Sequence, residues 1–169
     1  MKTYVDAAAL EDIKRRFPAV EYSGEEAKPA VYISADELIA LLKFLRDEMG
    51  FTRMENLTAV DYKTYFEMVY HLFAWKTADT CKDSADENLW ITVKVKLDHE
   101  NPEIPSVTSV FSGSEFEERE VYDLMGINIT GHPDLRRILL WEGFPGHPLR
   151  KDYKQIAPPF VERITRRGH

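Results

Sequence analysis

The stretch EREVYDLMGINITGHPDLRRILLWEGFPGHPLRKDY, residues 118–153, divides the chain into a folded body and a tail. Its first residues belong to a densely charged helix predicted over 115–125, after which regular periodicity stops. Glycine, proline and arginine dominate the rest, and Gly131-His132-Pro133 is echoed by Gly146-His147-Pro148. A surface loop of this length with so many arginines is unusual in a free-standing domain. We therefore expect the tail to lie against another protein.

The charge of the chain is distributed unevenly between body and tail. The 169 residues carry a net charge of −7, which argues against nucleic acid as the main partner. From residue 131 onward, however, eight Lys/Arg residues face four Asp/Glu residues, which gives +4 and leaves −11 on the first 130 residues. The basic tail thus predicts an interaction surface that pairs with acidic groups.

Composition excludes several classes of protein. The single cysteine, Cys81, cannot frame a disulfide core, and an iron–sulfur cluster takes about four cysteine ligands. We expect no cluster in this chain and a reducing compartment. The N-terminal residues reach Asp6 before an apolar region develops, so they do not resemble a signal peptide. No apolar run approaches the roughly 18–20 residues that span a bilayer, so we expect a soluble or peripheral protein.

A first helix is predicted close to the N-terminus. Asp6 is placed to cap it, and Pro18 stops it because the residue before a proline is pushed out of the helical region. Short extended segments are predicted over 19–23 and 30–33, separated by an acidic turn at 24–26. The apolar face of this helix consists of Ala9, Leu10, Ile13 and Phe17.

Helical periodicity is clearest in the second predicted helix. Ser34 and Glu37 have the S-x-x-E spacing of a capping box, and Gly50 is placed to end the helix. A continuous apolar stripe between these residues predicts a face buried in the core. The stripe consists of Leu38, Leu41, Leu42, Leu45 and Met49.

After residue 51 the period of the apolar residues changes to two. Strands are predicted over 56–61, 65–75 and 90–97, with a hairpin connection at 61–64 and a charged surface loop over 76–88. Strict alternation in the last strand is typical of a sheet that is buried on one face and solvated on the other, the usual form of antiparallel sheets. The pattern predicts an α+β two-layer domain with helices packed on a mostly antiparallel sheet.

Beyond Asn101 the chain is predicted to be irregular, with a short helix over 106–111. Ser114 and Glu117 repeat the S-x-x-E spacing and are expected to start the charged helix over 115–125, which we call the signature helix. Gly126 is placed to end it.

The domain prediction follows from these elements. We expect one α+β domain over 1–128, which includes the signature helix 115–125, and an extended Gly/Pro/Arg-rich tail over 129–169 that docks on a partner subunit.

Acidic and apolar residues are mixed around the signature helix. Arg119 can pair with Glu115 and Asp123 at i±4, and Glu117 is expected to serve in the cap. Glu118 lies one turn below Tyr122, an arrangement suited to a helix covered by a partner that brings counter-charges. Because a buried unpaired carboxylate is destabilising, ion-paired scaffolding fits these acids better than catalysis.

No motif indicates a self-sufficient enzyme. The sequence has no G-x-G-x-x-G after a strand, no G-x-x-x-x-G-K-[ST] and no G-x-S-x-G. His132 and His147 could bind metal or move protons, but neither has a second histidine or cysteine at ligand spacing. We expect both rings to pack on or bond to backbone in tight turns. His71 is expected to be an ordinary sheet residue.

The charged residues of this region resemble the signature of one family, the 30 kDa subunit of respiratory complex I, known as the C subunit of bacterial NADH:quinone oxidoreductase. Residues 146–153, GHPLRKDY, also resemble the downstream segment of that family, whereas Lys154 departs from the proline often found there. The matching positions are Glu118-Arg119-Glu120, Asp123, Leu124-Met125, His132, Arg136 and Ile138-Leu139.

The resemblance implies a peripheral-arm subunit on the cytoplasmic side of the cell inner membrane. Such a subunit is inactive in isolation and holds no cofactor, because FMN, Fe–S clusters and quinone are bound by partner subunits. Members of the family pack against the large quinone-pocket subunit, of the 49 kDa or D type, with the C-terminal tail laid over it. Electrons pass from NADH to quinone through those other subunits.

The residues expected to meet the partner come from the signature helix and the two G-H-P echoes, and none is expected to be catalytic, cofactor-binding or metal-binding. We expect much of 141–169 to be mobile or loosely docked until the partner is bound. The interface residues are Glu118, Arg119, Glu120, Asp123, His132, Pro133, Arg136, Arg137, His147, Pro148, Arg150, Lys151, Asp152 and Tyr153.

Two other interpretations stay open at the level of sequence. Related assemblies use an equivalent subunit: membrane-bound energy-converting hydrogenases, formate hydrogenlyase and deazaflavin (F420H2) dehydrogenases. A free-standing interaction adaptor is a second alternative. The large subunit that co-purifies distinguishes them, since quinone-pocket residues indicate complex I and nickel-ligating cysteines indicate a hydrogenase.

Overall fold

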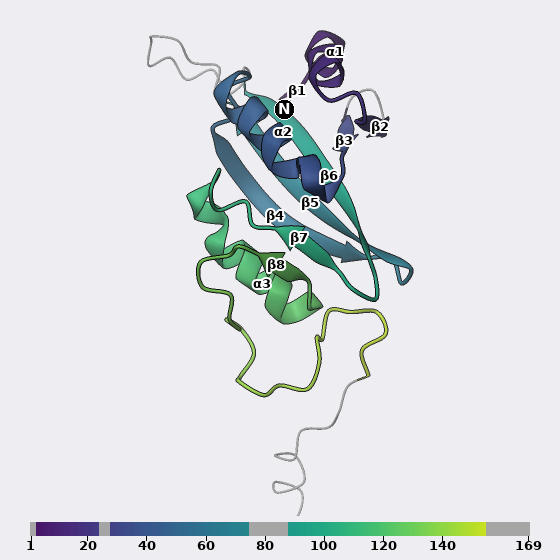
Figure 1. The fold of residues 1–169 in the computed structure, drawn as a ribbon, viewed down its shortest axis with the longest axis vertical. Coiled ribbons are helices and arrows are strands. Elements are labelled where there is room, and N and C mark those ends of the chain that lie inside the picture. The colour runs from purple at the N-terminus through teal and green to yellow at the C-terminus, as the bar shows by residue number, and fades with distance from the viewer. Residues whose placement is uncertain (1–2, 24–27, 75–87, 155–169) are drawn as a thin grey trace, which may run out of the picture.

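The computed structural model describes residues 3–23, 28–74 and 88–154 (Figure 1). The predicted α+β fold is confirmed, with helices packed on a mixed, mostly antiparallel sheet. The helices are α1 (Ala7–Arg16), α2 (Ala35–Asp47) and α3 (Glu115–Met125), with the 3-10 turn η1 (Ser112–Ser114) before α3. The strands are β1 (Thr3–Tyr4), β2 (Glu21–Ser23), β3 (Ala30–Tyr32), β4 (Arg53–Asp61), β5 (Tyr65–Ala74), β6 (Leu89–Asp98), β7 (Glu103–Pro105) and β8 (Asn128–Thr130).

The main sheet is built around the long strand β6. Its order is β2-β3-β6-β5-β4, and β1 also pairs with β6. The consecutive strands β4, β5 and β6 are antiparallel, whereas β1 and β3 run parallel to β6. Both short strands fit on one edge of β6 because β1 pairs at Leu89 and Trp90 and β3 pairs from Thr92 onward.

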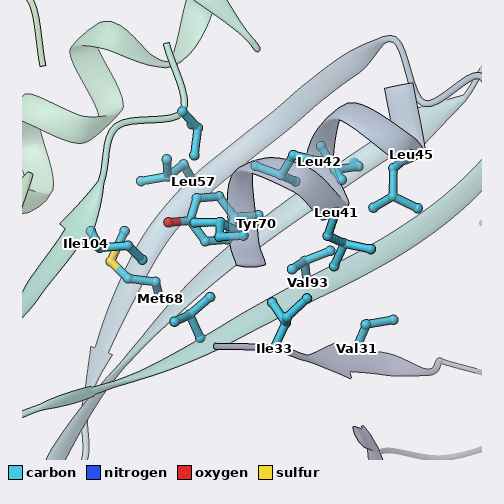
Figure 2. Packing of buried hydrophobic residues seen from close by; sticks show 14 of the residues in the cluster. Val31, Ile33, Leu41, Leu42, Leu45, Leu57, Met68, Tyr70, Val93 and Ile104 are labelled. Carbon is cyan, nitrogen blue, oxygen red and sulfur yellow. The ribbon is translucent and has the colours of Figure 1, made fainter. Parts of the chain in front are cut away.

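Helix α2 supplies one layer of the core (Figures 1 and 2). Four leucines of its predicted stripe have no exposed surface, and they meet apolar residues of β5 and β6 such as Tyr70 and Val93. The alternation predicted for β6 is confirmed, because Val93 and Val95 are fully buried whereas Lys96 is exposed. The buried leucines of α2 are Leu38, Leu41, Leu42 and Leu45.

Of the three side chains predicted to cap helix N-termini, only Asp6 does so, whereas Gly126 ends α3 in the left-handed conformation, as predicted. The Asp6 carboxylate accepts from the Ala9 backbone N–H at 2.9 Å, as expected. Neither serine caps a helix. The Ser34 side chain makes no cap bond and lies 3.4 Å from the Glu37 carboxylate. The Ser114 backbone is already helical, so its hydroxyl donates back to the Phe111 carbonyl at 2.7 Å.

A small second sheet was not predicted. Strand β7 pairs in parallel with β8 through Ile104 and Ile129, although the two strands lie on either side of η1 and α3. The segment 106–111, predicted as a short helix, forms turns instead. Three-residue strands are too short for a period to emerge, which explains why this part of the body looked irregular.

Tyr70 is the largest of the fully buried side chains in the described chain. Its side chain is fully buried, and its hydroxyl has no hydrogen-bond partner within the described part of the chain. Burial, together with the charge of Glu118, raises the pKa of the hydroxyl well above its usual value.

Because the Tyr70 hydroxyl is desolvated without a compensating bond, Tyr70→Phe is expected to leave the free energy of unfolding unchanged or to raise it by up to about 1 kcal/mol. Urea denaturation of the two proteins measures the difference. A loss of more than about 1 kcal/mol would show that the hydroxyl has a bonded partner in solution.

Some predicted features lie outside the described residues. These are the acidic turn at 24–26, the loop 76–88 apart from Asn88, Trp75 at the predicted end of a strand, and residues 155–169. Within the described ranges, none of the helices is long and apolar enough to cross a bilayer.

Candidate functional site

Helix α3 carries the signature residues and lies against β4 and the small sheet (Figure 1). Glu117 does not cap it. Instead, its carboxylate accepts a hydrogen bond from the Leu57 backbone of β4. Burial raises the pKa of Glu117 despite that bond, and the charges of Glu120 and Glu55 raise it further. The predicted helix forms, but Glu117 packs against the sheet and does not cap the helix.

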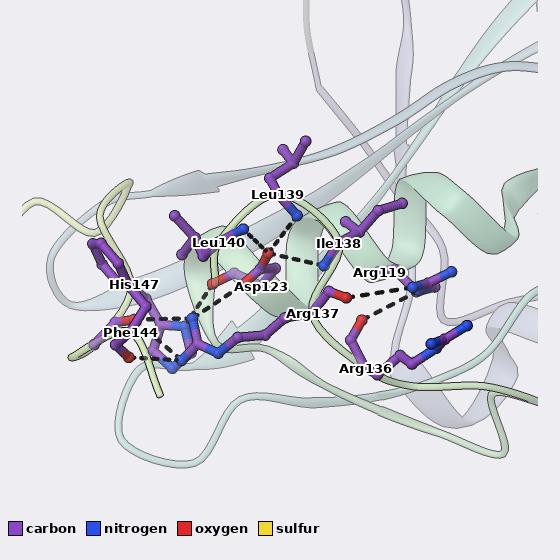
Figure 3. Close-up of polar contacts among 10 residues, drawn as sticks. Arg119, Asp123, Arg136, Arg137, Ile138, Leu139, Leu140, Phe144 and His147 are labelled. Atoms are coloured by element: carbon purple, nitrogen blue, oxygen red, sulfur yellow. Dashed lines mark hydrogen bonds and ion pairs between the residues drawn. The ribbon is translucent and has the colours of Figure 1, made fainter. Parts of the chain in front are cut away.

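Asp123 is the centre of the site (Figure 3). Its carboxylate is completely buried, and one oxygen accepts from three consecutive backbone N–H groups. The other oxygen accepts from the Arg137 guanidinium at 2.9 Å. The three N–H donors belong to Ile138, Leu139 and Leu140, at 3.0, 2.8 and 2.9 Å.

All four partners of Asp123 are donors, and this fixes its ionisation. Burial alone raises the pKa of the carboxyl, but the N–H groups of residues 138–140 and the charge of Arg137 outweigh it and hold the pKa below its usual value. The Arg137 guanidinium also donates to the carbonyl of Phe144 at 3.2 Å. One carboxylate thus shapes the tail from residue 137 to residue 144.

The pairing predicted for Arg119 is wrong. Its guanidinium donates to the carbonyls of Arg136 and Arg137, at 3.2 and 3.3 Å, and lies 5.7 Å from the centre of the Phe116 ring. It forms no ion pair with Glu115 or Asp123 within the described residues. The counter-charge expected from a partner comes instead from the chain's own tail, because Arg137 neutralises Asp123.

His132 holds the first G-H-P segment, residues 131–133, which we call the first echo; the second echo is the G-H-P segment 146–148 with the residues up to Lys151. One ring nitrogen, Nδ1, accepts from the Asp134 backbone N–H at 3.0 Å, so it carries no proton. The other, Nε2, lies 3.1 Å from the Glu115 carbonyl and must donate to it. These two bonds assign the neutral Nε2–H tautomer. The prediction of a histidine bonded to backbone in a tight turn is confirmed for this residue.

Glu118 is the second buried carboxylate of α3. Its oxygens accept from the Ser106 hydroxyl and the Val107 backbone N–H, each at 2.7 Å, and His132 Nε2 lies 3.8 Å away. Burial raises the pKa of Glu118, and the bonds from Val107 and Ser106 offset only part of that rise. Unlike Asp123, Glu118 meets a hydroxyl, which can reverse its bond and accept.

Glu118→Gln is therefore expected to change the free energy of unfolding by no more than about 1 kcal/mol at neutral pH, since the Ser106 hydroxyl can accept from the new amide. Because the pKa of the wild-type carboxyl is raised on folding, its contribution to stability is present at low pH. That contribution is lost as the pH rises from the pKa of the unfolded state, about 4.3, through the pKa of the folded state. We expect this pH dependence to be absent from the variant. Urea denaturation at several pH values measures it, and a large loss at every pH would contradict the assignment.

The second echo covers the C-terminal end of α3. His147 Nδ1 donates to the Asp123 carbonyl at 2.9 Å, and the Leu149 N–H donates to the Leu124 carbonyl at 3.1 Å. The Arg150 guanidinium donates to the carbonyls of Met125 and Gly126, at 2.6 and 3.1 Å. These are the carbonyls that a helix end leaves without partners, and a cation there also interacts favourably with the helix dipole.

The tail passes very close to the helix at Gly126. This residue has φ +69°, and a Cβ added to it would lie 2.5 Å from the His147 ring and 2.9 Å from the Arg150 guanidinium. Further along, the Lys151 N–H donates at 2.7 Å to Asp61 at the end of β4. The tail up to Lys151 is thus bound to its own chain, and the expectation that much of 141–169 is loosely held before a partner binds stays a prediction.

The outer surface of this region is apolar and exposed. Leu139, Trp141 and Phe116 are each about 60% exposed, at 62%, 60% and 61%. Trp141 packs edge-on against Phe144, and the Phe144 ring stacks with Tyr153 at 6.3 Å. The backbone of this segment is bound to Asp123 while its apolar side chains face outward. The exposed apolar residues form what we call the tail surface: Phe116, Ile138, Leu139, Trp141 and Leu149.

The other predicted interface residues lie at the periphery of the site. Arg136 is exposed and pairs with Asp134 at 2.8 Å, and Glu120 is exposed on α3. Pro133 and Asp152 are exposed, whereas Pro148 and Tyr153 are half-buried.

Sequence reasoning missed Ser106, Val107 and Asp61, because no local pattern links them to their partners, which lie 11 to 90 positions away in the sequence. In the described ranges no group of three or more His, Cys, Asp or Glu side chains is arranged to hold a metal ion.

Comparison with known proteins identifies the family of this chain. The model of the family "Respiratory-chain NADH dehydrogenase, 30 Kd subunit" matches residues 31–159. A curated relative, the NADH-quinone oxidoreductase C subunit of Moorella thermoacetica, is 42% identical over 147 residues, covering 86% of this chain and 93% of the relative.

Two solved structures share the fold. One is a trypsin-resistant fragment of Nqo5, with a TM-score of 0.60 and 26% identity, covering 76% of this chain and 97% of that chain. The other is a chain of the membrane-bound sulfane sulfur reductase, an archaeal respiratory membrane complex, with a TM-score of 0.72 and 22% identity over 94% of this chain and 90% of that one. The chain therefore belongs to the 30 kDa subunit family of respiratory-chain NADH dehydrogenase, the family of the C subunit of bacterial NADH-quinone oxidoreductase.

Proposed function

We propose that this chain is a scaffold subunit in the peripheral arm of a proton-translocating NADH-quinone oxidoreductase. It packs against the large subunit that forms the quinone pocket, and the tail surface is the part it presents. We call the bonds from Arg137 and from the N–H groups of residues 138–140 to the Asp123 carboxylate the Asp123 clamp. The observation that carries the proposal is that this clamp fixes residues 137–140 while Ile138, Leu139 and Trp141 stay exposed. Large exposed apolar side chains on a fixed backbone are typical of a protein–protein interface.

The redox chemistry belongs to other subunits in this proposal. FMN, the Fe–S clusters and quinone are bound there, and electrons pass from NADH to quinone without entering this chain. The assembled complex places the chain on the cytoplasmic side of the cell inner membrane as a peripheral component. Support comes from the names of the relatives and from the lack of a nucleotide-binding or cluster-binding motif in the sequence.

The test is co-purification with the tagged large subunit. In the double variant Leu139→Ser/Trp141→Ser, we expect at least a tenfold loss of recovered complex, because exposed anchors near the centre of an interface contribute about 2 kcal/mol or more each. The unfolding midpoint of the free variant should match that of the wild type, since both side chains are about 60% exposed. Wild-type recovery would show that the partner binds elsewhere.

The identity of the captured partner separates the alternatives. A large subunit with quinone-pocket residues supports the proposal, and nickel-ligating cysteines indicate an energy-converting hydrogenase or formate hydrogenlyase. Capture of no redox subunit indicates an adaptor. Flavin and iron analysis of the washed free chain tests the cofactor part of the proposal, and a stoichiometric amount of either would contradict it.

A further inference from the structure

Lysines and tyrosines contact one another in a series that begins on the face of the sheet opposite α2 and continues over the β4–β5 hairpin to the tail. Lys96 lies 5.1 Å from the centre of the Tyr32 ring and 5.7 Å from that of Tyr65. Tyr65 stacks on Tyr62 at 4.8 Å, and Lys151 lies 5.7 Å from the Tyr62 ring. Lys94 completes the series at 5.5 Å from Tyr32. We call this series the lysine–tyrosine row: Tyr32, Tyr62, Tyr65, Lys94, Lys96 and Lys151.

Three separate parts of the chain build the row. Strand alternation turns Lys94 and Lys96 away from the core, because Val93 and Val95 between and beside them face α2. The hairpin between β4 and β5 contributes Tyr62 and Tyr65. The tail contributes Lys151, whose backbone N–H is bound to Asp61 at 2.7 Å. This backbone bond to Asp61 therefore places the Lys151 side chain beside the hairpin.

The row carries positive charge that the described chain neutralises only in part. Lys94 pairs with the buried Glu67 carboxylate at 2.8 Å, but neither Lys96 nor Lys151 forms a side-chain ion pair within the described residues. Both are exposed, in a protein whose net charge is −7. Each ammonium group is held over a ring, which restricts its motion and leaves N–H donors directed to solvent.

We propose that the lysine–tyrosine row is a second interaction surface, which binds a carboxylate-rich segment of another protein. Ammonium and phenol groups both donate to carboxylates, although the Tyr32 hydroxyl already donates to Glu67 at 3.0 Å. Rings that already orient the lysines lower the entropy lost on binding. An anionic membrane suits the row less well, because a planar surface also meets the field of the acidic body, whereas a short segment meets only the local positive charge. The row shares no residue with the tail surface, although Lys151 is also among the residues predicted to meet the partner subunit.

The test uses the free full-length chain and a blocked oligoglutamate peptide at low ionic strength. Fluorescence anisotropy should show binding that Lys96→Gln weakens by about fivefold, as expected for an exposed charge pair at the upper end of its range. The matched control is Lys43→Gln, which removes one exposed lysine from α2. It should weaken binding by less than about 1.5-fold if the effect is local rather than a change of net charge. Amide chemical shifts should move at residues 65 and 96.

Three outcomes would overturn the proposal. The first is an absence of peptide binding to the wild type. The second is an equal loss in the Lys43→Gln control, which would indicate a net-charge effect. The third is binding to phosphatidylserine-containing vesicles but not to the peptide, which would indicate a membrane surface. Because no partner subunit is present, none of these outcomes bears on the co-purification test.

Discussion

Asp123→Asn is expected to lower the free energy of unfolding of the free chain by about 3 kcal/mol, the low end of the range for breaking a buried ion pair. The carboxylate is fully buried, and its partners are the guanidinium of Arg137 and three backbone N–H groups. An asparagine amide has one acceptor atom in place of two and turns an N–H₂ group toward donors that cannot reverse. Urea denaturation of the free chain measures the loss.

The exposed pair of Arg136 and Asp134 provides the control. Its N···O distance, 2.8 Å, is as short as that of the buried pair, but both side chains are largely solvated. Asp134→Asn is therefore expected to lower stability by less than about 1 kcal/mol. If Asp123→Asn were no more harmful than this control, the clamp would not hold the tail in solution.

The loss caused by Asp123→Asn should also depend on pH in a defined way. The pKa of Asp123 is held below its unfolded value, so its contribution to stability is present above about pH 4 and is lost as pH falls through the folded pKa. Wild-type stability should therefore decline in acid more steeply than that of Asp123→Asn. The two curves should converge at low pH, where the carboxyl is protonated in both the folded and unfolded wild type. Parallel curves would mean that the pKa of Asp123 is the same in the folded and the unfolded protein.

The periodic elements were predictable from sequence because their faces are set by local spacing. The leucine stripe of α2 and the alternation of β6 both placed the correct residues in the core. The two S-x-x-E patterns predicted helix starts correctly but not their caps, since a side chain's hydrogen bond depends on the backbone before it. At Ser114 that backbone is already helical because η1 precedes α3.

The sequence predicted the kind of bonds that the tail forms but not the residues that accept them. Arginine was expected to find carboxylates, and Arg137 does so at Asp123. The expectation that another protein would supply the acceptors overlooked the end of α3, whose free carbonyls need donors in any fold. Backbone acceptors leave no trace in a sequence, and so the bonds of His147 and Arg150 could be found only in the structure. Whether the remaining signature residues meet a partner stays a prediction.

Gly126→Ala is expected to be the most damaging single-methyl change in the described chain, with a loss of about 3 kcal/mol. About 1 kcal/mol arises from placing a Cβ at φ +69°, a left-handed conformation that glycine adopts without strain. The rest arises because the new methyl group would lie 2.5 Å from the His147 ring. The second echo must then move off the helix, leaving buried carbonyls at the end of α3 unsatisfied.

A matched glycine separates the two parts of that effect. Gly131 has φ +74°, and an added Cβ would meet nothing within 4 Å, so Gly131→Ala should show the conformational loss alone, about 1 kcal/mol. Limited trypsin digestion supplies a second readout: only Gly126→Ala should expose the bonds after Arg150 and Lys151 to rapid cleavage, because only that change displaces the second echo. Equal stability and equal cleavage in the two variants would mean that the tail does not rest on the end of α3 in solution. A selective effect of Gly126→Ala would establish that this segment is part of the domain's own fold before any partner binds.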